Sequence, residues 1–348
     1  LYLSEPMIEF AEEVAAVSGI PDAKVFFTTS GSEANDTALL LATHYRKSNE
    51  VLAMRNSYHG RSFTTQAITS HRSWSNTAVS GLSVNFVQGP YKLRSPHHDA
   101  DDEGYTQACV ADLVQVIDMM TAGDVACLIA EPIQGVGGFA TPPDGFFGAM
   151  HKVLDSHGIL FVSDEVQTGW GRTGDHFWGY QAHGIVPDML TFAKGVGNGI
   201  TLAGIVGRPE VMDCLPHLSF STFGGNPLST AAGLATLRYV QEADLQGNAK
   251  ARGQQMKERL SPVVEGADWI AELRGKGLMQ AIETVHAGSI EPDAKAAKVL
   301  LERAKDNGLL IGKGGLYGNV LRLTPMLNIT EQEMDQGLDA LIAAIASV

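Results

Sequence analysis

The stretch KVFFTTSGSEANDTALLLATHYRK, residues 24–47, joins an apolar run, a Ser/Gly turn and an amphipathic helix. In its second half apolar residues recur at helical spacing and predict a helix with these residues on one face: Ala34, Ala38, Leu41, Ala42 and Tyr45. Short apolar runs that end in polar residues and glycine recur at 50–60, 125–135, 159–169 and 189–199. Strands that alternate with helices predict an α/β fold with a mostly parallel central sheet covered by helices on both faces.

The polar residues that end these runs form the first candidate site. In such sheets ligands bind outside the carboxyl ends of the strands, so residues at those ends should share one rim. The residues expected on this rim are Ser32, Tyr58, His59, Glu131, Asp164, Gln167 and Lys194.

The pattern of predicted helices and strands changes near residue 235. Beyond it the sequence predicts short strands near 277–283 and 318–325 and helices at 293–308 and 330–346, the last opened by a Thr330/Glu333 capping box. We therefore expect a large domain over residues 1–235 and a smaller α+β domain over residues 236–348. The polar, acidic segment 92–107 is expected to be a solvated loop.

Composition narrows the functional class. The 348 residues carry a formal net charge of −14, which argues against binding to nucleic acid, and no apolar run of membrane-spanning length is present. Three separated cysteines indicate neither a disulfide framework nor a zinc knuckle, so a cytoplasmic location is predicted. Because the chain begins at Leu1, we expect the natural N-terminus, and any targeting signal, to lie upstream.

Lys194 and Asp164 point to covalent chemistry with a cofactor. A lysine at a strand end is usually a solvated cation, but a neutral lysine amine can condense with a carbonyl, and the glycines of AKGVGNG (193–199) leave room for a ring. Asp164 can be a helix cap, or a buried carboxylate that keeps a pyridinium nitrogen protonated.

The turn TSGSEAN, residues 29–35, is a candidate anion site. The free amides of Gly31 and Ser32 and the hydroxyls of Ser30 and Ser32 can surround a phosphate at the positive end of a helix. A serine N-cap with nothing bound is the alternative. Tyr58, in SYHG, suits stacking on a planar ring, although a single tyrosine is more often a core residue.

Three other patterns are set aside. The segment GVGNG, residues 195–199, does not match the dinucleotide motif G-x-G-x-x-G. The segment PHHD, residues 96–99, lacks partners at metal-ligand spacing, so no metal is expected. No G-x-S-x-G nucleophile motif occurs.

Taken together, DEVQTGWGRTG (164–174), AKGVGNG (193–199), EPIQG (131–135), STFGGNP (221–227) and GLYGNVLRLTP (315–325) resemble the class III aminotransferases, which are fold type I enzymes that use pyridoxal 5'-phosphate. The resemblance spans essentially the whole chain. Such enzymes carry several tens of residues before the segment that matches LYLSEP, residues 1–6, and we expect that part to be absent from this sequence.

The resemblance implies a role for each site residue. Lys194 is implied as the Schiff-base lysine, Asp164 as the partner of the ring nitrogen and Gln167 as a contact of the ring oxygen. The other implied cofactor contacts are Tyr58, which stacks on the ring, together with Gly31, Ser32, His59 and Glu131. Thr222 is implied to reach the phosphate of a neighbouring subunit, which implies a homodimer with shared sites. Arg322 and Glu131 are implied as a pair, in which Arg322 grips the α-carboxylate of the substrate and Glu131 neutralises Arg322 when the substrate lacks that carboxylate. A purely structural ion pair is the alternative.

The implied reaction moves an amino group from an amino acid or ω-amino acid to a 2-oxo acid by a ping-pong mechanism. The motifs look most like the alanine:glyoxylate type that also accepts β-aminoisobutyrate. A 4-aminobutyrate:2-oxoglutarate aminotransferase is the near alternative, and a decarboxylase or aminomutase on the same scaffold is another. A non-catalytic cofactor-binding protein is disfavoured, because pure binding needs no proton-transferring lysine.

Overall fold

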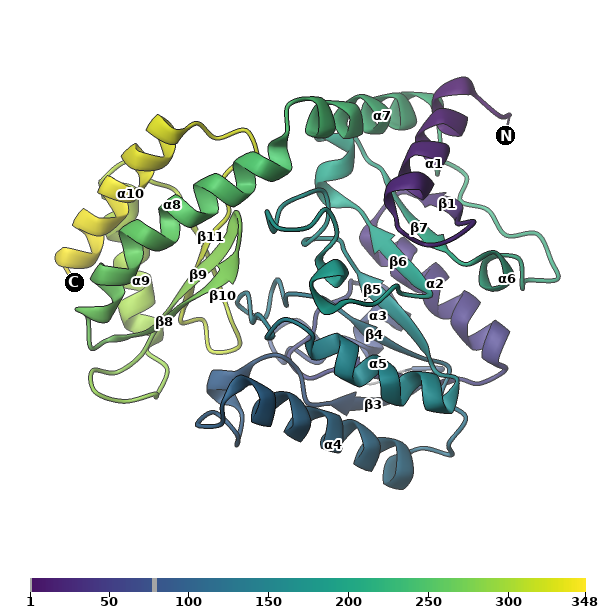
Figure 1. Ribbon diagram of the computed structural model, residues 1–348, viewed down its shortest axis with the longest axis horizontal. Coiled ribbons are helices and arrows are strands. Elements are labelled where there is room, and N and C mark those ends of the chain that lie inside the picture. The colour runs from purple at the N-terminus through teal and green to yellow at the C-terminus, as the bar shows by residue number, and fades with distance from the viewer. Residues whose placement is uncertain (1, 77–79) are drawn as a thin grey trace.

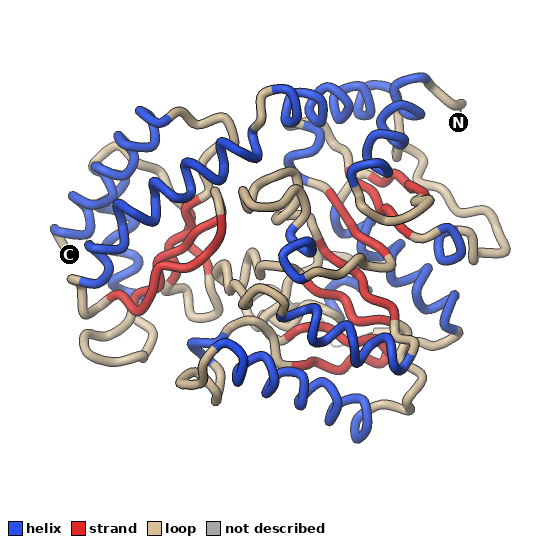
Figure 2. The backbone as a smooth tube through the Cα atoms, in the orientation of Figure 1, coloured by secondary structure: helices blue, strands red, loops and turns tan. Residues whose placement is uncertain are grey.

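The protein is described by a computed structural model that covers residues 2–76 and 80–348. The chain builds two β-sheets that lie side by side, each with helices packed against it (Figure 1). The backbone trace in Figure 2 shows that loops gather between the two sheets.

The larger sheet has seven strands in the order β1-β7-β6-β5-β4-β2-β3. Its strands are β1 (Lys24–Thr28), β2 (Glu50–Met54), β3 (Ser83–Val87), β4 (Cys127–Ala130), β5 (Leu160–Asp164), β6 (Met189–Phe192) and β7 (Ala203–Gly207). From β6 to β3 all neighbours are parallel, and only β7 runs antiparallel to its neighbours β6 and β1. The predicted, mostly parallel sheet is confirmed, whereas β3 and β7 were not expected.

Helices cover both faces of this sheet because its strands are apolar on both sides. In β4, Cys127 and Ile129 pack in the same cluster as α2 (Gly31–Arg46), while Leu128 and Ala130 pack with α4 (Asp102–Met120) and α5 (Phe146–His157). A third cluster joins α1 (Glu5–Val17) and α7 (Pro227–Glu242) to the β1 end of the sheet. The shorter helical segments are α3 (Phe63–Ala67), α6 (Pro209–Met212), η1 (Lys92–Arg94), η2 (Gly179–His183) and η3 (Lys194–Gly197).

The expectation of a solvated loop over residues 92–107 is wrong for its second half. Helix α4 begins at Asp102, and the Asp101 side chain caps it by accepting a hydrogen bond from the Gly104 amide. The acidic run is therefore an N-cap and a first helical turn, where negative charge is favourable.

The smaller sheet has four antiparallel strands in the order β10-β11-β9-β8. They are β8 (Ile270–Lys276), β9 (Met279–Thr284), β10 (Gly312–Gly314) and β11 (Val320–Leu323). The apolar cluster of this sheet includes residues of α8 (Leu245–Glu265), α9 (Ala294–Asp306) and α10 (Glu331–Ala346). The capping box of Thr330 and Glu333 is confirmed. The expected boundary after residue 235 falls inside α7, and the division into two domains stays a prediction.

Among the residues that the structure describes, no helix is both long and apolar enough to cross a bilayer.

Candidate active site

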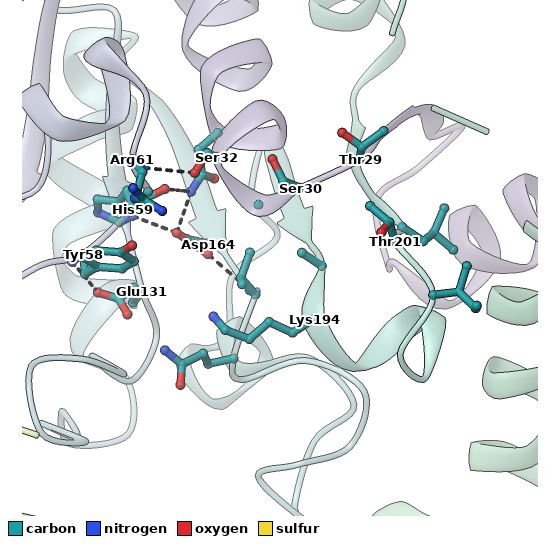
Figure 3. A pocket seen from close by; sticks show the side chains of 18 residues that line it. Thr29, Ser30, Ser32, Tyr58, His59, Arg61, Glu131, Asp164, Lys194 and Thr201 are labelled. Carbon is teal, nitrogen blue, oxygen red and sulfur yellow. Dashed lines mark hydrogen bonds and ion pairs between the residues drawn. The ribbon is translucent and has the colours of Figure 1, made fainter. Parts of the chain in front are cut away.

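A cavity of about 370 Å³ lies at the carboxyl ends of the parallel strands. Its volume is within the range of small-molecule sites. Nine of the residues expected from the sequence line it together: Ser30, Gly31, Ser32, Tyr58, His59, Glu131, Asp164, Gln167 and Lys194. Thr222 and Arg322 are not among its lining residues. In Figure 3 the amine of Lys194 extends toward Asp164 and Glu131, and Ser30 and Ser32 lie on the far side of Asp164.

Lys194 opens η3 just after β6 and has a left-handed backbone conformation, with φ of +52°. For a residue other than glycine this strain costs on the order of 1–3 kcal/mol and concentrates at functional sites. The Lys194 side chain is exposed to the open cavity, although protein encloses the cavity around it. Burial lowers the pKa of Lys194, against the opposing charges of Asp164 and Glu131, and a lower pKa favours the neutral, nucleophilic amine.

Asp164 ends β5 and is held from three directions. Its Oδ2 accepts a hydrogen bond from Asn35 Nδ2 at 2.8 Å and lies 2.8 Å from His59 Nδ1. Its Oδ1 accepts from the Val166 amide at 3.2 Å. Only 4% of Asp164 is exposed, so the carboxylate has one fixed orientation at the cavity.

Asn35 was missed by reasoning from the sequence. It is buried in the first turns of α2, where its amide also donates to the His59 carbonyl and accepts from Thr191 Oγ1. A polar residue among the apolar positions of that helix face was the available signal, because a buried amide needs partners.

Glu131 follows β4 and is a buried residue of the cavity wall. Its two carboxylate oxygens accept hydrogen bonds from the amides of Tyr58 at 2.9 Å and Gly135 at 2.8 Å. Burial raises the pKa of Glu131 to about 7; the charge of Asp164 adds to this, while His59 and the two amides oppose it. Among the described residues Glu131 and Arg322 form no ion pair, so the structure does not join the two residues that the resemblance pairs.

Arg322 lies on β11, outside the lining of this cavity. Its guanidinium carbon is 5.5 Å from the centre of the Phe139 ring, and its buried Nε has no hydrogen-bond partner within residues 2–76 and 80–348. Burial lowers the pKa of Arg322. Its positive charge helps to lower the pKa of Lys194, which places Arg322 within electrostatic reach of the cavity.

The N-terminus of α2 has the arrangement expected of an anion cradle. Ser30 is the N-cap and accepts from the Glu33 amide, while Ser32 Oγ accepts from the Arg61 amide at 3.0 Å. The amides of Gly31 and Ser32 lie in the first turn, so no carbonyl of the helix accepts a hydrogen bond from them. A Cβ on Gly60, whose φ is +144°, would lie 2.5 Å from Ser32 Oγ, so only glycine fits beside the cradle.

The remaining walls suit a planar ring. Tyr58 and Val166 both line the cavity, and the Tyr58 ring is supported edge-to-face by Trp74 at 5.5 Å between ring centres. Thr222, by contrast, is exposed on the segment between α6 and α7. An amine, a fixed carboxylate, an anion cradle and an aromatic wall together fit a phosphorylated pyridine aldehyde.

We expect Gly135→Ala to weaken cofactor binding through Gln167. A Cβ at residue 135 would lie 1.9 Å from Gln167 Nε2, so the Gln167 side chain must leave its place on the cavity wall. Loss of one hydrogen bond predicts about a fivefold to tenfold higher Kd for pyridoxal phosphate, measured on apoprotein by fluorescence titration. Gln167→Ala is the matched variant, and a double variant much weaker than either single one would contradict this route.

Fold and cavity define a fold type I pyridoxal-phosphate enzyme, and comparison with known proteins gives the family. Residues 1–345 match the model of the family described as Aminotransferase class-III. The chain therefore belongs to the class III aminotransferases and uses pyridoxal 5'-phosphate.

Three similar proteins illustrate the range of the family. Alanine–glyoxylate aminotransferase 2 homolog 2, mitochondrial, of Arabidopsis thaliana is 40% identical over 345 residues, which is 98% of this chain and 70% of that protein. A leucine/methionine racemase of Thermococcus litoralis is 37% identical over 352 residues, 99% of this chain and 77% of the racemase. The crystal structure of an amine transaminase from an uncultivated Pseudomonas species, in its PLP-bound form, matches with a TM-score of 0.92 and 31% identity over 99% of this chain and 82% of that one.

Proposed function

We propose that this class III aminotransferase moves an amino group from alanine, β-aminoisobutyrate or a 4-aminobutyrate-like donor to glyoxylate, pyruvate or 2-oxoglutarate. The observation that carries the proposal is the Lys194 amine, with a lowered pKa, in one cavity with the fixed Asp164 carboxylate. The similarity to the Arabidopsis alanine–glyoxylate aminotransferase homologue supports this choice of substrates.

Each wall of the cavity has a task in this proposal. Pyridoxal phosphate, when bound, supplies an electron sink for the carbanion formed at the substrate carbon. Lys194 would hold the cofactor at rest, and its Nζ, once free, would take the proton from the substrate carbon as general base and deliver it to the cofactor as general acid. Asp164 keeps the ring nitrogen protonated, while Asn35 and His59 hold that carboxylate in place. Gly31 and Ser32 bind the phosphate.

Arg322 binds the substrate carboxylate in this scheme. Its two-pronged guanidinium suits a carboxylate, and its Nε lacks a hydrogen-bond partner among the described residues. Glu131 supplies a compensating negative charge when the substrate lacks that carboxylate, and its raised pKa lets it take up a proton near neutrality.

A homodimer with shared sites belongs to the proposal. Thr222 is exposed, as are the apolar residues around it, Leu218, Phe220 and Phe223. Exposed apolar side chains gathered on one loop favour an interface with a second copy. Sedimentation of the holoenzyme tests this, and an active monomer would contradict it.

Turnover of defined substrates tests the reaction. Holoenzyme given L-alanine and glyoxylate should form pyruvate and glycine in equal amounts, and 4-aminobutyrate with 2-oxoglutarate should be compared as donor and acceptor. Carbon dioxide released without amino-group transfer would replace this proposal with the decarboxylase alternative.

Racemisation is the second candidate, favoured by the similarity to the Thermococcus racemase. A racemase returns the proton to the same carbon and needs no oxo acid. Holoenzyme given only L-alanine or L-leucine should leave optical rotation unchanged if transamination is the sole activity. We also propose a cytoplasmic location for this chain, although the Arabidopsis relative is named as a mitochondrial protein.

The pH dependence of stability should change in Glu131→Gln. In the folded protein the pKa of Glu131 is about 7, whereas its ordinary value is 4.5. Between these values the folded state binds more protons than the unfolded state, so Glu131 makes stability fall as pH rises, by an amount on the order of a few kcal/mol. Urea unfolding of wild type and variant across that window should show a smaller fall for Glu131→Gln, and equal pH slopes would contradict the raised pKa.

A further inference from the structure

A buried ionic network ties loops of the larger sheet to the four-stranded sheet. At its centre Glu283 of β9 is 0% exposed. Its carboxylate accepts hydrogen bonds from Tyr91 Oη at 2.9 and 2.8 Å, from Arg94 Nε at 3.0 Å and from Asn319 Nδ2 at 3.1 Å, and it is paired with Arg274 of β8. Tyr91 and Arg94 come from the segment around η1, so the network ties that segment to the four-stranded sheet.

The two arginines of this network face two carboxylates, because Glu272 also pairs with Arg274. Burial alone would raise the pKa of Glu283, but the guanidinium groups of Arg274 and Arg94 lower it below its usual range. Glu283 is therefore an ionised carboxylate shared by two partly buried arginines, and each partner depends on the other.

The other edge of Arg274 fixes the loop that follows Glu131. Its Nε and Nη2 both donate to the Gly138 carbonyl, at 2.9 and 2.6 Å. Gly138 and Phe139 are both left-handed, with φ of +95° and +53°. A Cβ on Gly138 would lie 3.0 Å from Gly315 Cα, so this turn is also packed tightly against the β10–β11 connection. Phe139 is held in a conformation that a free loop would leave.

The Phe139 ring then supports Arg322. Phe139 is 1% exposed, and the Arg322 guanidinium carbon lies over its ring at 5.5 Å. Among the described residues Arg322 has neither a carboxylate partner nor a hydrogen bond from Nε. Stacking on the ring is therefore one contact that orients the guanidinium, whose Nε side also lies beside Gly314 of β10.

We propose that Phe139 is a positioning residue for carboxylate recognition: Glu283 and Arg274 anchor its loop through the Gly138 carbonyl, and its ring holds Arg322 in the orientation that binds a substrate carboxylate. This inference rests on the proposed role of Arg322. It places a determinant of substrate affinity in the junction between the two sheets, away from the cofactor cavity.

Binding of propionate, an unreactive carboxylate, to holoenzyme tests the proposal by isothermal titration calorimetry. Phe139→Leu keeps apolar volume but removes the ring face, and we expect propionate to bind at least about fivefold more weakly. The KM for alanine should rise by a similar factor, while kcat and the visible absorption of the cofactor stay within about twofold of wild type. Phe139→Met provides the same comparison if the leucine variant does not fold.

Ile133→Val is the matched control, because Ile133 packs in the same cluster as Phe139 without contacting Arg322 through a ring. It should leave propionate affinity unchanged. Unchanged affinity in Phe139→Leu, or an equal loss in Ile133→Val, would overturn the proposal.

Arg274→Lys tests the anchor, since a lysine cannot reach both Glu283 and the Gly138 carbonyl with two parallel bonds. It should weaken propionate binding in the wild-type background and have little further effect in Phe139→Leu, because both act through one route. Additive losses would overturn the role of the network. Arg322→Gln separates the role of Arg322 from the role of Phe139. Unchanged propionate affinity in Arg322→Gln rejects the proposed function of Arg322. Weaker binding in Arg322→Gln together with unchanged binding in Phe139→Leu rejects only this inference.

Discussion

Replacing Lys194 by alanine should abolish turnover and, with it, the visible absorption of the lysine-linked cofactor. Lys194 is the lysine that lines the cavity, and its Nζ is both the proposed attachment point and the group that moves the proton. Without it the rate should fall by at least about 10⁴-fold, the upper range for a positioned acid–base group. Steady-state assay and absorption spectroscopy of the purified variant measure the two losses.

The control for this variant is Lys298→Ala, which removes an exposed lysine from α9. It should keep both activity and absorption. If Lys194→Ala retains either property, the assignment of Lys194 is wrong.

Asp164→Asn should fold normally and lose most of its activity. The amide keeps the shape of the side chain, and its oxygen can still accept from Asn35 or from the Val166 amide. A neutral group no longer favours a protonated ring nitrogen, so kcat should fall by about 10²-fold or more, as for the loss of one preorganised electrostatic contact. Single-turnover kinetics with alanine, followed through the cofactor absorption, measure the step directly.

Asp118→Asn, on the exposed face of α4, controls for the loss of a charge elsewhere in this acidic protein. It should leave the rate unchanged. Near-normal turnover in Asp164→Asn would remove Asp164 from the mechanism, and a large fall in melting temperature would show that its role is structural.

Local patterns carried much of the fold and the site. Apolar runs that end in polar residues predicted β1, β2, β4, β5 and β6, and the carboxyl-end rule then placed seven residues on one cavity, from Ser32 to Lys194. The rule works because parallel strands share one direction, so their ends meet although they are far apart in the chain. β7 was not predicted because the short segment 203–207, rich in alanine and glycine, has little hydrophobic periodicity. Its antiparallel direction depends on its neighbours β1 and β6.

What the sequence determined by itself is therefore the α/β class, the helix and strand positions of highest periodicity, and the residue types that can hold pyridoxal phosphate. Tertiary structure alone decided which partners hold those residues. The hydrogen bond between Asn35 and Asp164 joins residues 129 positions apart in the sequence. The hydrogen bond between Arg274 and the Gly138 carbonyl joins residues 136 positions apart. Such contacts arise from the packing of whole elements, whose energy is shared among many side chains, so no local spacing records them.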